Sequence, residues 1–452
     1  MTHAAQIGEA ARPPGTKDLL RSFGRIGVLS FGGPAAQIAL MHQELVDRRG
    51  WLSDRAFADA LAFCMVLPGP EAMQLATYCG WRLRGVPGGL LAGGLFVLPG
   101  ALVIACLALL YGHLGTQGWA MAALLGIKTA VIIIVVQALV GLVRRAITGH
   151  AQIGMAMAAF GGLWLLHVPF PLVIALAAGL GWLRTVQSPA SPAPPKAKPP
   201  QSGAHARSAR RTLAATTRTA VIWGTLWALP LLVLALTGQD LLWDIAVFFG
   251  VLAVVTFGGA YAVLAYMAQQ VVNHHGWLSP PQMIDALGLA ETTPGPLILV
   301  TQFVGMTAGL TQGGLVFALM AGAVTLWMTF VPCFLWIFAG APYIASIATR
   351  PRLRGALDMV AAAVVGVMLN LSLWFAIHVL FQTVERVQIG PVHMPVPQAS
   401  TLDGQALALV GLAAVLGLAL RWSSVWLIPT MAGAGVALSS VVQAGGAGFV
   451  FP

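Results

Sequence analysis

Two short motifs that disrupt helices occur twice in this chain at one fixed spacing. Phe-Gly-Gly at 31–33 returns at 257–259, and Pro-Gly-Pro at 68–70 returns at 294–296, in both cases 226 positions later. Adjacent glycines weaken a helix by about 1 kcal/mol each, and prolines remove hydrogen-bond donors and clash with the preceding turn. A helix that restarts after such a break exposes N–H groups and its positive dipole end, which suit an anion. The motifs therefore predict an anion site.

The repeat extends well beyond these motifs. Residues 31–53 and 257–279 align at the same offset, and about half of the aligned residues are identical. Discontinuous helices in corresponding positions of two related halves are a pointer to a transporter binding site. For any single motif another interpretation stays open, in which glycine allows close helix packing and proline only kinks a span. The duplication of both motifs favours the binding site.

The composition is that of a membrane protein. The chain has 452 residues, of which 58% are hydrophobic and 8% charged, whereas soluble proteins carry roughly 25% charged residues. Apolar runs long enough to cross about 30 Å of hydrocarbon recur from end to end, and the short alternating segments of a β-barrel are absent. The net charge of +10 lies in loops beside the spans, where it sets topology, so we expect no nucleic-acid partner.

We therefore expect an all-α polytopic membrane protein with two homologous halves arranged as inverted repeats. The expected domains are residues 1–186 with six spans, a flexible basic cytoplasmic linker at 187–218, and residues 219–452 with seven spans, the first of them extra. The thirteen expected spans lie near 20–41, 56–80, 88–112, 119–143, 151–168, 170–185, 219–238, 244–270, 283–308, 313–340, 355–381, 403–420 and 424–442. This arrangement puts Arg48, Arg49 and Arg55 outside, against the positive-inside rule.

Candidate site residues cluster around the breaks. Glu71 and Glu291 are expected to be intramembrane carboxyl groups, which are costly and therefore candidates for proton coupling; capping of the restarted helix or pairing with an arginine is an open alternative for each. Arg82 and Arg84 are candidates for gating or for pairing with Glu71, or else are interfacial anchors. The candidate substrate-binding residues are Phe31, Gly32, Gly33, Pro68, Gly69, Pro70, Gln74, Phe257, Gly258, Gly259, Thr292, Thr293, Pro294, Gly295, Pro296 and Gln302.

The order of these motifs resembles the chromate ion transporter family, in its long two-domain bacterial form. Phe31 to Pro34, Trp51 to Ser53 and Pro68 to Pro70 carry the resemblance in the first half; Thr256 to Gly259, Gly276 to Ser279 and Thr292 to Pro296 carry it in the second. The resemblance implies a multi-pass carrier of the bacterial inner membrane that exports chromate, driven by protons, and gives chromate resistance. Sulfate is a dianion of the same shape, so a sulfate or other oxyanion carrier stays open.

Other function classes are disfavoured. No catalytic motif lies at membrane depth, so we expect no enzyme. The four cysteines lack metal-ligand spacing, and we expect neither a metal nor a cofactor. The expected partners are a chromate-like or sulfate-like dianion, protons and the lipid bilayer. An anion channel and a homodimer are both kept open.

Overall fold

The computed structural model describes residues 14–115, 117–187, 205–255, 260–344, 351–389 and 392–446, almost all of them helical. The first half contains α1 (Thr16–Leu29), α2 (Gly33–His42), α3 (Asp54–Cys64), α4 (Glu71–Leu114), α5 (Gly118–Ala146), α6 (His150–Trp164) and α7 (Phe170–Gln187). The second contains α8 (His205–Thr237), α9 (Asp240–Val255), α10 (Ala260–Gln269), α11 (Pro280–Glu291), α12 (Val300–Gly340), α14 (Pro351–Leu380), α15 (Gly404–Ala414) and α16 (Ser424–Gly446).

Short irregular turns connect several of these helices. A π-helical turn follows α2 (η1, Gln43–Arg48), α10 (η2, Gln270–His274) and α15 (η6, Val415–Ala419). Tighter turns are η3 (Leu297–Leu299) before α12, η4 (Ala341–Tyr343) after it, and η5 (Ala399–Thr401) before α15. The π turns η1 and η2 occupy corresponding places in the two halves, as the repeat predicts.

The all-α membrane class is confirmed. Six helical segments of the described chain are long and apolar enough to cross a membrane: Glu71–Leu114, Gly118–Ala146, Leu213–Thr237, Leu297–Tyr343, Pro351–Leu380 and Ser424–Val442. The count of thirteen spans is not confirmed. Sequence analysis missed the antiparallel hairpin of β1 (Val384–Ile389) and β2 (Val392–Pro397), in which Val384 pairs with Pro397. It also placed 205–218 in the linker, whereas α8 already begins at His205, because the alanine-rich segment there lacks proline.

The expected span 20–41 is wrong as a single crossing. The helix stops at Leu29 and restarts at Gly33, and an Arg25 guanidinium nitrogen lies 3.9 Å from a Glu44 carboxylate oxygen. A straight helix would separate these two residues by more than about 25 Å, so α1 and α2 double back as a hairpin. In the second half the rings of Phe248 and Tyr266 lie 6.2 Å apart across the corresponding break, so α9 and α10 also double back.

The helices α4 and α12 are hairpins as well. A straight helix of 44 residues, the length of α4, would measure about 66 Å, twice the thickness of a bilayer. The chain turns at Arg84 and Gly85 in α4, and at Gly313 and Gly314 in α12, with nearly the same backbone angles. At the second residue of each turn φ is +65° (Gly85) or +66° (Gly314), a conformation that only glycine adopts readily.

The motif Trp-Leu-Ser explains how α3 and α11 begin. The Ser53 hydroxyl accepts a hydrogen bond from the Ala56 amide, and the Ser279 hydroxyl accepts one from the Gln282 amide. The side-chain oxygen of Gln282 in turn accepts a hydrogen bond from the Ser279 amide, which completes a capping box. Serine therefore satisfies the first turn of each helix that leads to a Pro-Gly-Pro break.

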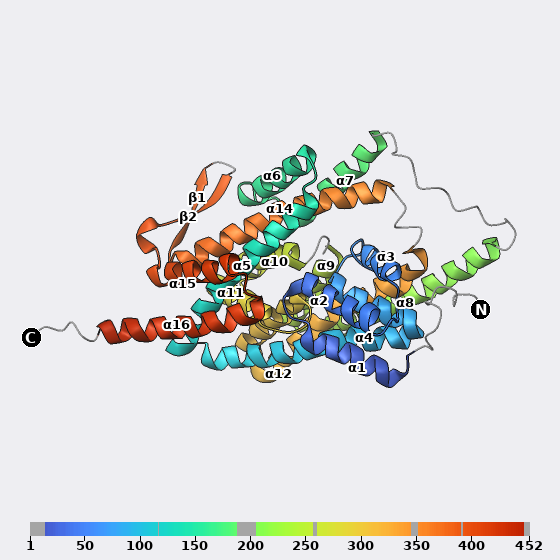
Figure 1. The fold of residues 1–452 in the computed structure, drawn as a ribbon, viewed down its shortest axis with the longest axis horizontal. Helices are drawn as coiled ribbons and strands as arrows, with labels where there is room; N and C mark the ends of the chain where they lie inside the picture. Colours follow the sequence, from blue (N-terminus) through green and yellow to red (C-terminus); the bar gives the residue numbers. More distant parts are fainter. Residues whose placement is uncertain are drawn as a thin grey trace, which may run out of the picture.

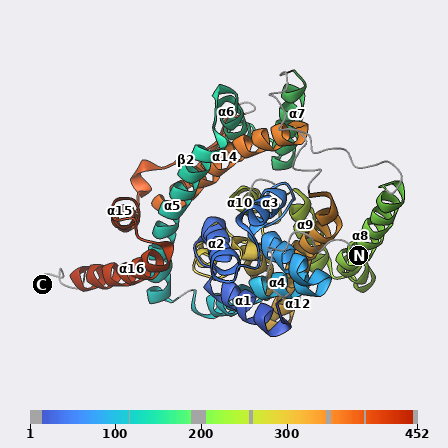
Figure 2. The same cartoon turned by 45° about the vertical axis from the view of Figure 1, so that its right-hand side comes forward.

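Two layers make up the fold (Figure 1). In Figure 2 the long helices α5 and α14 form an arc together with α6, α7, α15 and α16. We call these six helices the arc, and we call α1–α4 and α9–α12 the inner cluster. The two halves exchange helices within the arc, because α6 and α7 of the first half pack on α14 and α16 of the second packs on α5.

Glycines allow the backbones of the exchanged helices to approach each other closely. A Cβ added to Gly126 on α5 would lie 1.9 Å from the Met431 carbonyl oxygen on α16, and one added to Gly366 on α14 would lie 2.1 Å from the Ala156 carbonyl oxygen on α6. Small residues at helix crossings allow the backbone contact that holds helices together in lipid.

We predict that Gly126→Ala lowers the stability of the protein by about 1–3 kcal/mol, because α5 and α16 must separate to admit a methyl group. Thermal unfolding of the purified protein in detergent measures the effect. Gly141→Ala, on the same helix with nothing within 4 Å of the added Cβ, is the matched control and should be neutral or stabilising. Equal behaviour of the two variants would contradict the packing of α16 on α5.

Candidate functional site

Breaks from the two halves touch each other within the inner cluster. The Gly295 amide, in the second Pro-Gly-Pro, donates to the Ser30 carbonyl at the end of α1 over 2.9 Å. The side-chain amide nitrogen of Gln37 lies between the two segments, 2.7 Å from the Gly295 carbonyl oxygen and 3.3 Å from that of Ser30. These three hydrogen bonds join backbone groups that the interrupted helices leave unpaired.

Each Pro-Gly-Pro break packs against the other half. Gly295 has φ +88°, and a Cβ added to it would lie 3.3 Å from the Phe96 carbonyl oxygen on α4. Gly69 has φ +119°, and its added Cβ would lie 3.0 Å from the Cys333 sulfur on α12. Both positions require glycine for the backbone conformation and for the close approach. The two breaks therefore hold corresponding positions on opposite halves.

Two of the helices that follow the breaks begin without a side-chain cap. This holds for α2 after Gly32 and for η3 after Pro296. The first N–H groups of such helices carry a partial positive charge. At the start of α4, after Pro70, the Glu71 carboxyl group interacts with its own backbone amide. The predicted fourth break, Phe257, Gly258 and Gly259, lies outside the described residues.

The glutamine and threonine side chains of the predicted site donate hydrogen bonds to backbone carbonyls at or near the breaks. The side-chain amide of Gln74 donates to the Pro68 carbonyl over 2.6 Å, and that of Gln302 donates to the Ala101 carbonyl over 3.1 Å. Their Oε1 atoms are buried with no protein hydrogen-bond partner. The hydroxyls of Thr292 and Thr293 donate to carbonyls one turn back, at the end of α11. These side chains shape the breaks, and the glutamine oxygens face inward as acceptors.

The two predicted carboxyl groups lie at helix ends beside the breaks. Glu71 is the first residue of α4, where its carboxyl group interacts with its own backbone amide. Glu291 is the last residue of α11 and is 7% exposed. It lines a small cavity whose other walls are apolar: Val131, Val135, Leu264, Leu287, Leu371 and Phe375.

The predicted arginines lie at the far end of the first arm of α4. Eleven residues of helix separate Glu71 from Arg82, which is about 16 Å, so neither arginine reaches this carboxyl group. Arg82 instead interacts with Tyr78, and the Arg84 guanidinium donates to the Thr16 hydroxyl at the start of α1 over 2.7 Å. The hypothesis of a Glu71–arginine pair is therefore wrong for this conformation.

Sequence analysis missed three groups near the site. Gln37 carries no local signal, and Cys333 reads as a buried apolar residue. Asp285 falls in the expected span 283–308, so the rule that singled out Glu291 applies to it equally. The structure pairs Asp285 with Lys128 and Tyr111.

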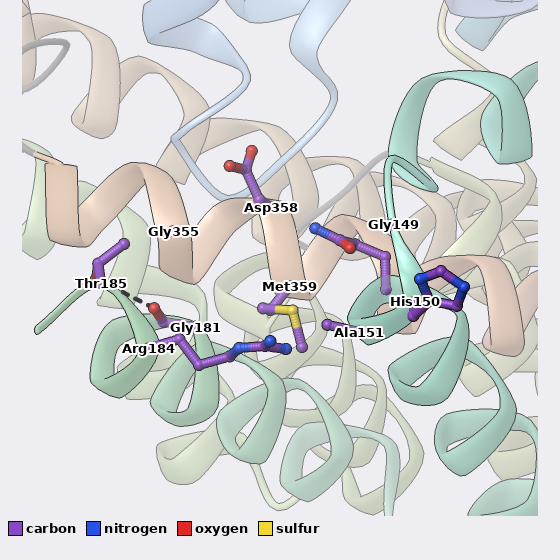
Figure 3. Close-up of a pocket in the computed structure, with 10 residues that line it drawn as sticks. Gly149, His150, Ala151, Gly181, Arg184, Thr185, Gly355, Asp358 and Met359 are labelled. Carbon is purple, nitrogen blue, oxygen red and sulfur yellow. Dashed lines mark hydrogen bonds between the residues drawn. The ribbon is translucent and has the colours of Figure 1, made fainter. Parts of the chain in front are cut away.

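Two larger cavities lie apart from the breaks. One of about 490 Å³ opens between α6, α7 and α14 and is lined by His150, Arg184 and Asp358 among others (Figure 3). Another of about 640 Å³ lies between α6, α10, α14 and the β-hairpin, with His167, His274 and His378 in its wall. Neither contains a predicted site residue. The second shares Leu371 with the small cavity at Glu291.

The comparison with known sequences identifies the family. The family described as chromate transporter matches residues 17–182 and again 243–438, which covers both sets of breaks. The chain belongs to the chromate transporter family. The family's members named below are transport proteins, and this chain is accordingly a membrane transport protein and not an enzyme.

Several curated relatives cover most of the chain. The chromate transport protein of Pseudomonas aeruginosa is 34% identical over 370 residues, 80% of this chain and 81% of the relative. That of Cupriavidus metallidurans is 30% identical over 362 residues, 77% of this chain and 80% of the relative. A probable chromate transport protein of Synechococcus elongatus is 29% identical over 356 residues, 77% and 82% of the two chains. No solved structure matches this chain.

We predict that Gln37→Leu destabilises the protein by about 1–3 kcal/mol, because the buried Gly295 carbonyl loses its donor. Thermal unfolding in detergent measures this loss. Gln312→Leu, at the exposed turn of α12, removes a glutamine without such a contact and should change stability little. A Gln37 variant as stable as the natural protein would mean that the breaks do not depend on this bridge.

The histidine that corresponds to Arg49 allows a prediction on pH. In the first half the Arg49 guanidinium lies 4.9 Å from the Trp51 ring centre; in the second, the His275 ring stacks on Trp277 at 4.2 Å. Burial, and then the neighbouring His274, lower the pKa of His275 from its ordinary 6.5, while Asp244 opposes the shift.

We predict that His275 makes the protein less stable as the pH falls below 6.5, because the unfolded chain then binds this proton more readily than the native state does. The variant His275→Phe should lose less thermal stability than the natural protein over that range. His113→Phe, at an exposed position near the end of α4, serves as the control and should follow the natural protein. Identical pH profiles for all three proteins would refute the prediction.

Proposed function

We propose that the protein exports chromate from the cytoplasm across the bacterial inner membrane, coupled to protons, and thereby gives chromate resistance. Membership of the chromate transporter family and the names of the relatives support chromate as the substrate. One structural observation carries the mechanism: the Gly295 amide bonds to the Ser30 carbonyl, so breaks from both halves meet at one place. Convergent helix starts from two repeats are typical of substrate sites in secondary transporters.

We infer that the halves, 1–186 and 219–452, are inverted with respect to each other and connected by a basic cytoplasmic segment within 187–218. The corresponding second arms of α4 and α12 pack antiparallel, since Gly89 faces Phe338 and Gly93 faces Phe334. Corresponding helices that run antiparallel are what a two-fold axis in the membrane plane produces.

The hairpins also remove the conflict with the positive-inside rule. Because α2 doubles back on α1, Arg48 and Arg49 return toward the side on which α1 begins. Arg84 lies on that side too, next to Thr16. Cationic residues on one side mark the cytoplasm, so this proposal places the tip of the α1–α2 hairpin inside the membrane and its open end in the cytoplasm. The turn of α4 at Arg84 and Gly85 then lies on the cytoplasmic side as well.

The dianion is bound, in this proposal, at the starts of α2, α4 and η3, and the repeated motif at 257–259 is a further candidate from the sequence. Backbone N–H groups at helix starts suit an oxyanion without requiring a cationic side chain. Gln74 and Gln302 hold the breaks in shape, and Thr292 and Thr293 fix the end of α11. Arg82 and Arg84 attract the anion at the cytoplasmic mouth, and Glu71 and Glu291 exchange protons beside the site.

We predict that everted membrane vesicles accumulate labelled chromate when a proton gradient is imposed, and that collapse of the gradient stops the accumulation. Vesicles without the protein are the control. Excess unlabelled sulfate should compete weakly, whereas equal competition by sulfate would indicate a general oxyanion carrier. Movement only down the chromate gradient would identify a channel and overturn the proposal of proton coupling.

We predict that Glu291→Gln reduces gradient-driven chromate uptake about tenfold, within the range of coupling between linked ligands, because the amide cannot take up a proton. Exchange of chromate without a gradient should persist. Glu385→Gln, on the exposed β-hairpin, is the matched control and should leave uptake unchanged. Undiminished gradient-driven uptake by the Glu291 variant would remove this residue from the coupling step.

A further inference from the structure

A buried group of three polar side chains lies between the two layers of the molecule. The Lys128 ammonium is 2.9 Å from one carboxylate oxygen of Asp285, and the Tyr111 hydroxyl donates to the other over 2.9 Å. The Asp285 side chain is 6% exposed and that of Lys128 is 18% exposed. An ion pair in a membrane segment is costly and is retained mostly for function.

The pair connects elements of different layers. Lys128 lies on α5 in the arc, whereas Asp285 lies on α11 and Tyr111 on α4, both in the inner cluster. The ion pairs around Glu44 and His42, by contrast, all lie within residues 25–54. A relative movement of the two layers would therefore separate Lys128 from Asp285.

Apolar side chains occupy the surroundings of the pair. An adjoining cavity of about 160 Å³ is lined by Tyr111, Leu114, Ile127 and Leu289 among others. The charged or titratable groups that face Asp285 in the described chain are Lys128 and Tyr111. Glu291 lies on the same helix, about 9 Å further along. Once Lys128 moves away, nothing else described there neutralises the carboxylate, and a buried carboxylate without a cation takes a proton.

The repeat does not duplicate the group. Asp59 occupies the position that corresponds to Asp285 but is exposed. The backbone of the repeat is thus duplicated while this charge cluster is not. A structural role that followed from the fold alone would be expected in both copies.

We propose that Asp285 is a further proton-binding site of the carrier, in addition to Glu71 and Glu291, and that Lys128 is its movable counter-ion. In the conformation described, Lys128 and Tyr111 hold Asp285 ionised. When the inner cluster shifts against the arc, Asp285 takes the proton and Lys128 is released with its positive charge available to the dianion. This inference rests on the proposed function, because it adds one carboxyl group to those that exchange protons in that transport cycle.

The decisive transport experiment uses the double variant K128M/D285N in everted vesicles. Either single variant leaves the other member of the ion pair buried without its partner, so it should yield less folded protein. The double variant removes both charges and should be recovered at natural levels by size-exclusion chromatography. Its gradient-driven chromate uptake should fall about tenfold, while exchange without a gradient persists. D59N is the matched control and should behave as the natural protein. Uptake by the double variant within twofold of the natural protein would overturn the proposal.

A second measurement does not depend on chromate. Infrared difference spectra of the purified protein on acidification should contain a protonated carboxyl band that K128M/D285N lacks and that D59N retains. An unchanged spectrum in K128M/D285N would overturn the proposal even if chromate transport is confirmed. If the natural protein moves no chromate but K128M/D285N lacks the band, the proposed function fails while the proton site stands.

Discussion

A helix that stops inside a bilayer leaves backbone N–H and C=O groups that lipid cannot satisfy. This protein satisfies them by joining break to break: Gly295 donates to Ser30, and Gln37 bridges the two. In this joint between the breaks, the second half supplies the N–H donor and the first half the carbonyl acceptor. The close approach of the two backbones requires glycine at position 295. The starts of α2 and η3, which follow the two joined segments, have no side-chain cap, and in the proposed function their N–H groups bind the anion.

The exchange of helices between the halves follows from the weakness of the hydrophobic effect within lipid. Helices there associate through close packing, and small residues allow it. Gly126 against Met431 and Gly366 against Ala156 give backbone contact between α5 and α16 and between α14 and α6. Each half thus completes the other's part of the arc. The arc and the inner cluster, and not the two sequence halves, are the packed layers of the molecule.

The two copies share a backbone and differ in charge. The turns at Gly85 and Gly314 have almost the same dihedral angles, yet Arg49 is replaced by His275 and the exposed Asp59 by the buried Asp285. Backbone geometry is held by glycine and by internal packing, which both copies need. In the proposed function ionisable groups serve binding and coupling, for which a single site suffices, and this accounts for their divergence between the copies.

Local chemistry alone determined the membrane class, the repeat, the family and the places where helices break, because apolar length and the effects of glycine and proline act within a few residues. The sequence could not show that 20–41 doubles back, since a broken helix restarts in whichever direction its distant neighbours allow. For the same reason Gln37 and the pairing of Lys128 with Asp285 emerged only from the tertiary structure: their partners lie 258 and 157 positions away along the chain, and only packing brings them within hydrogen-bond distance.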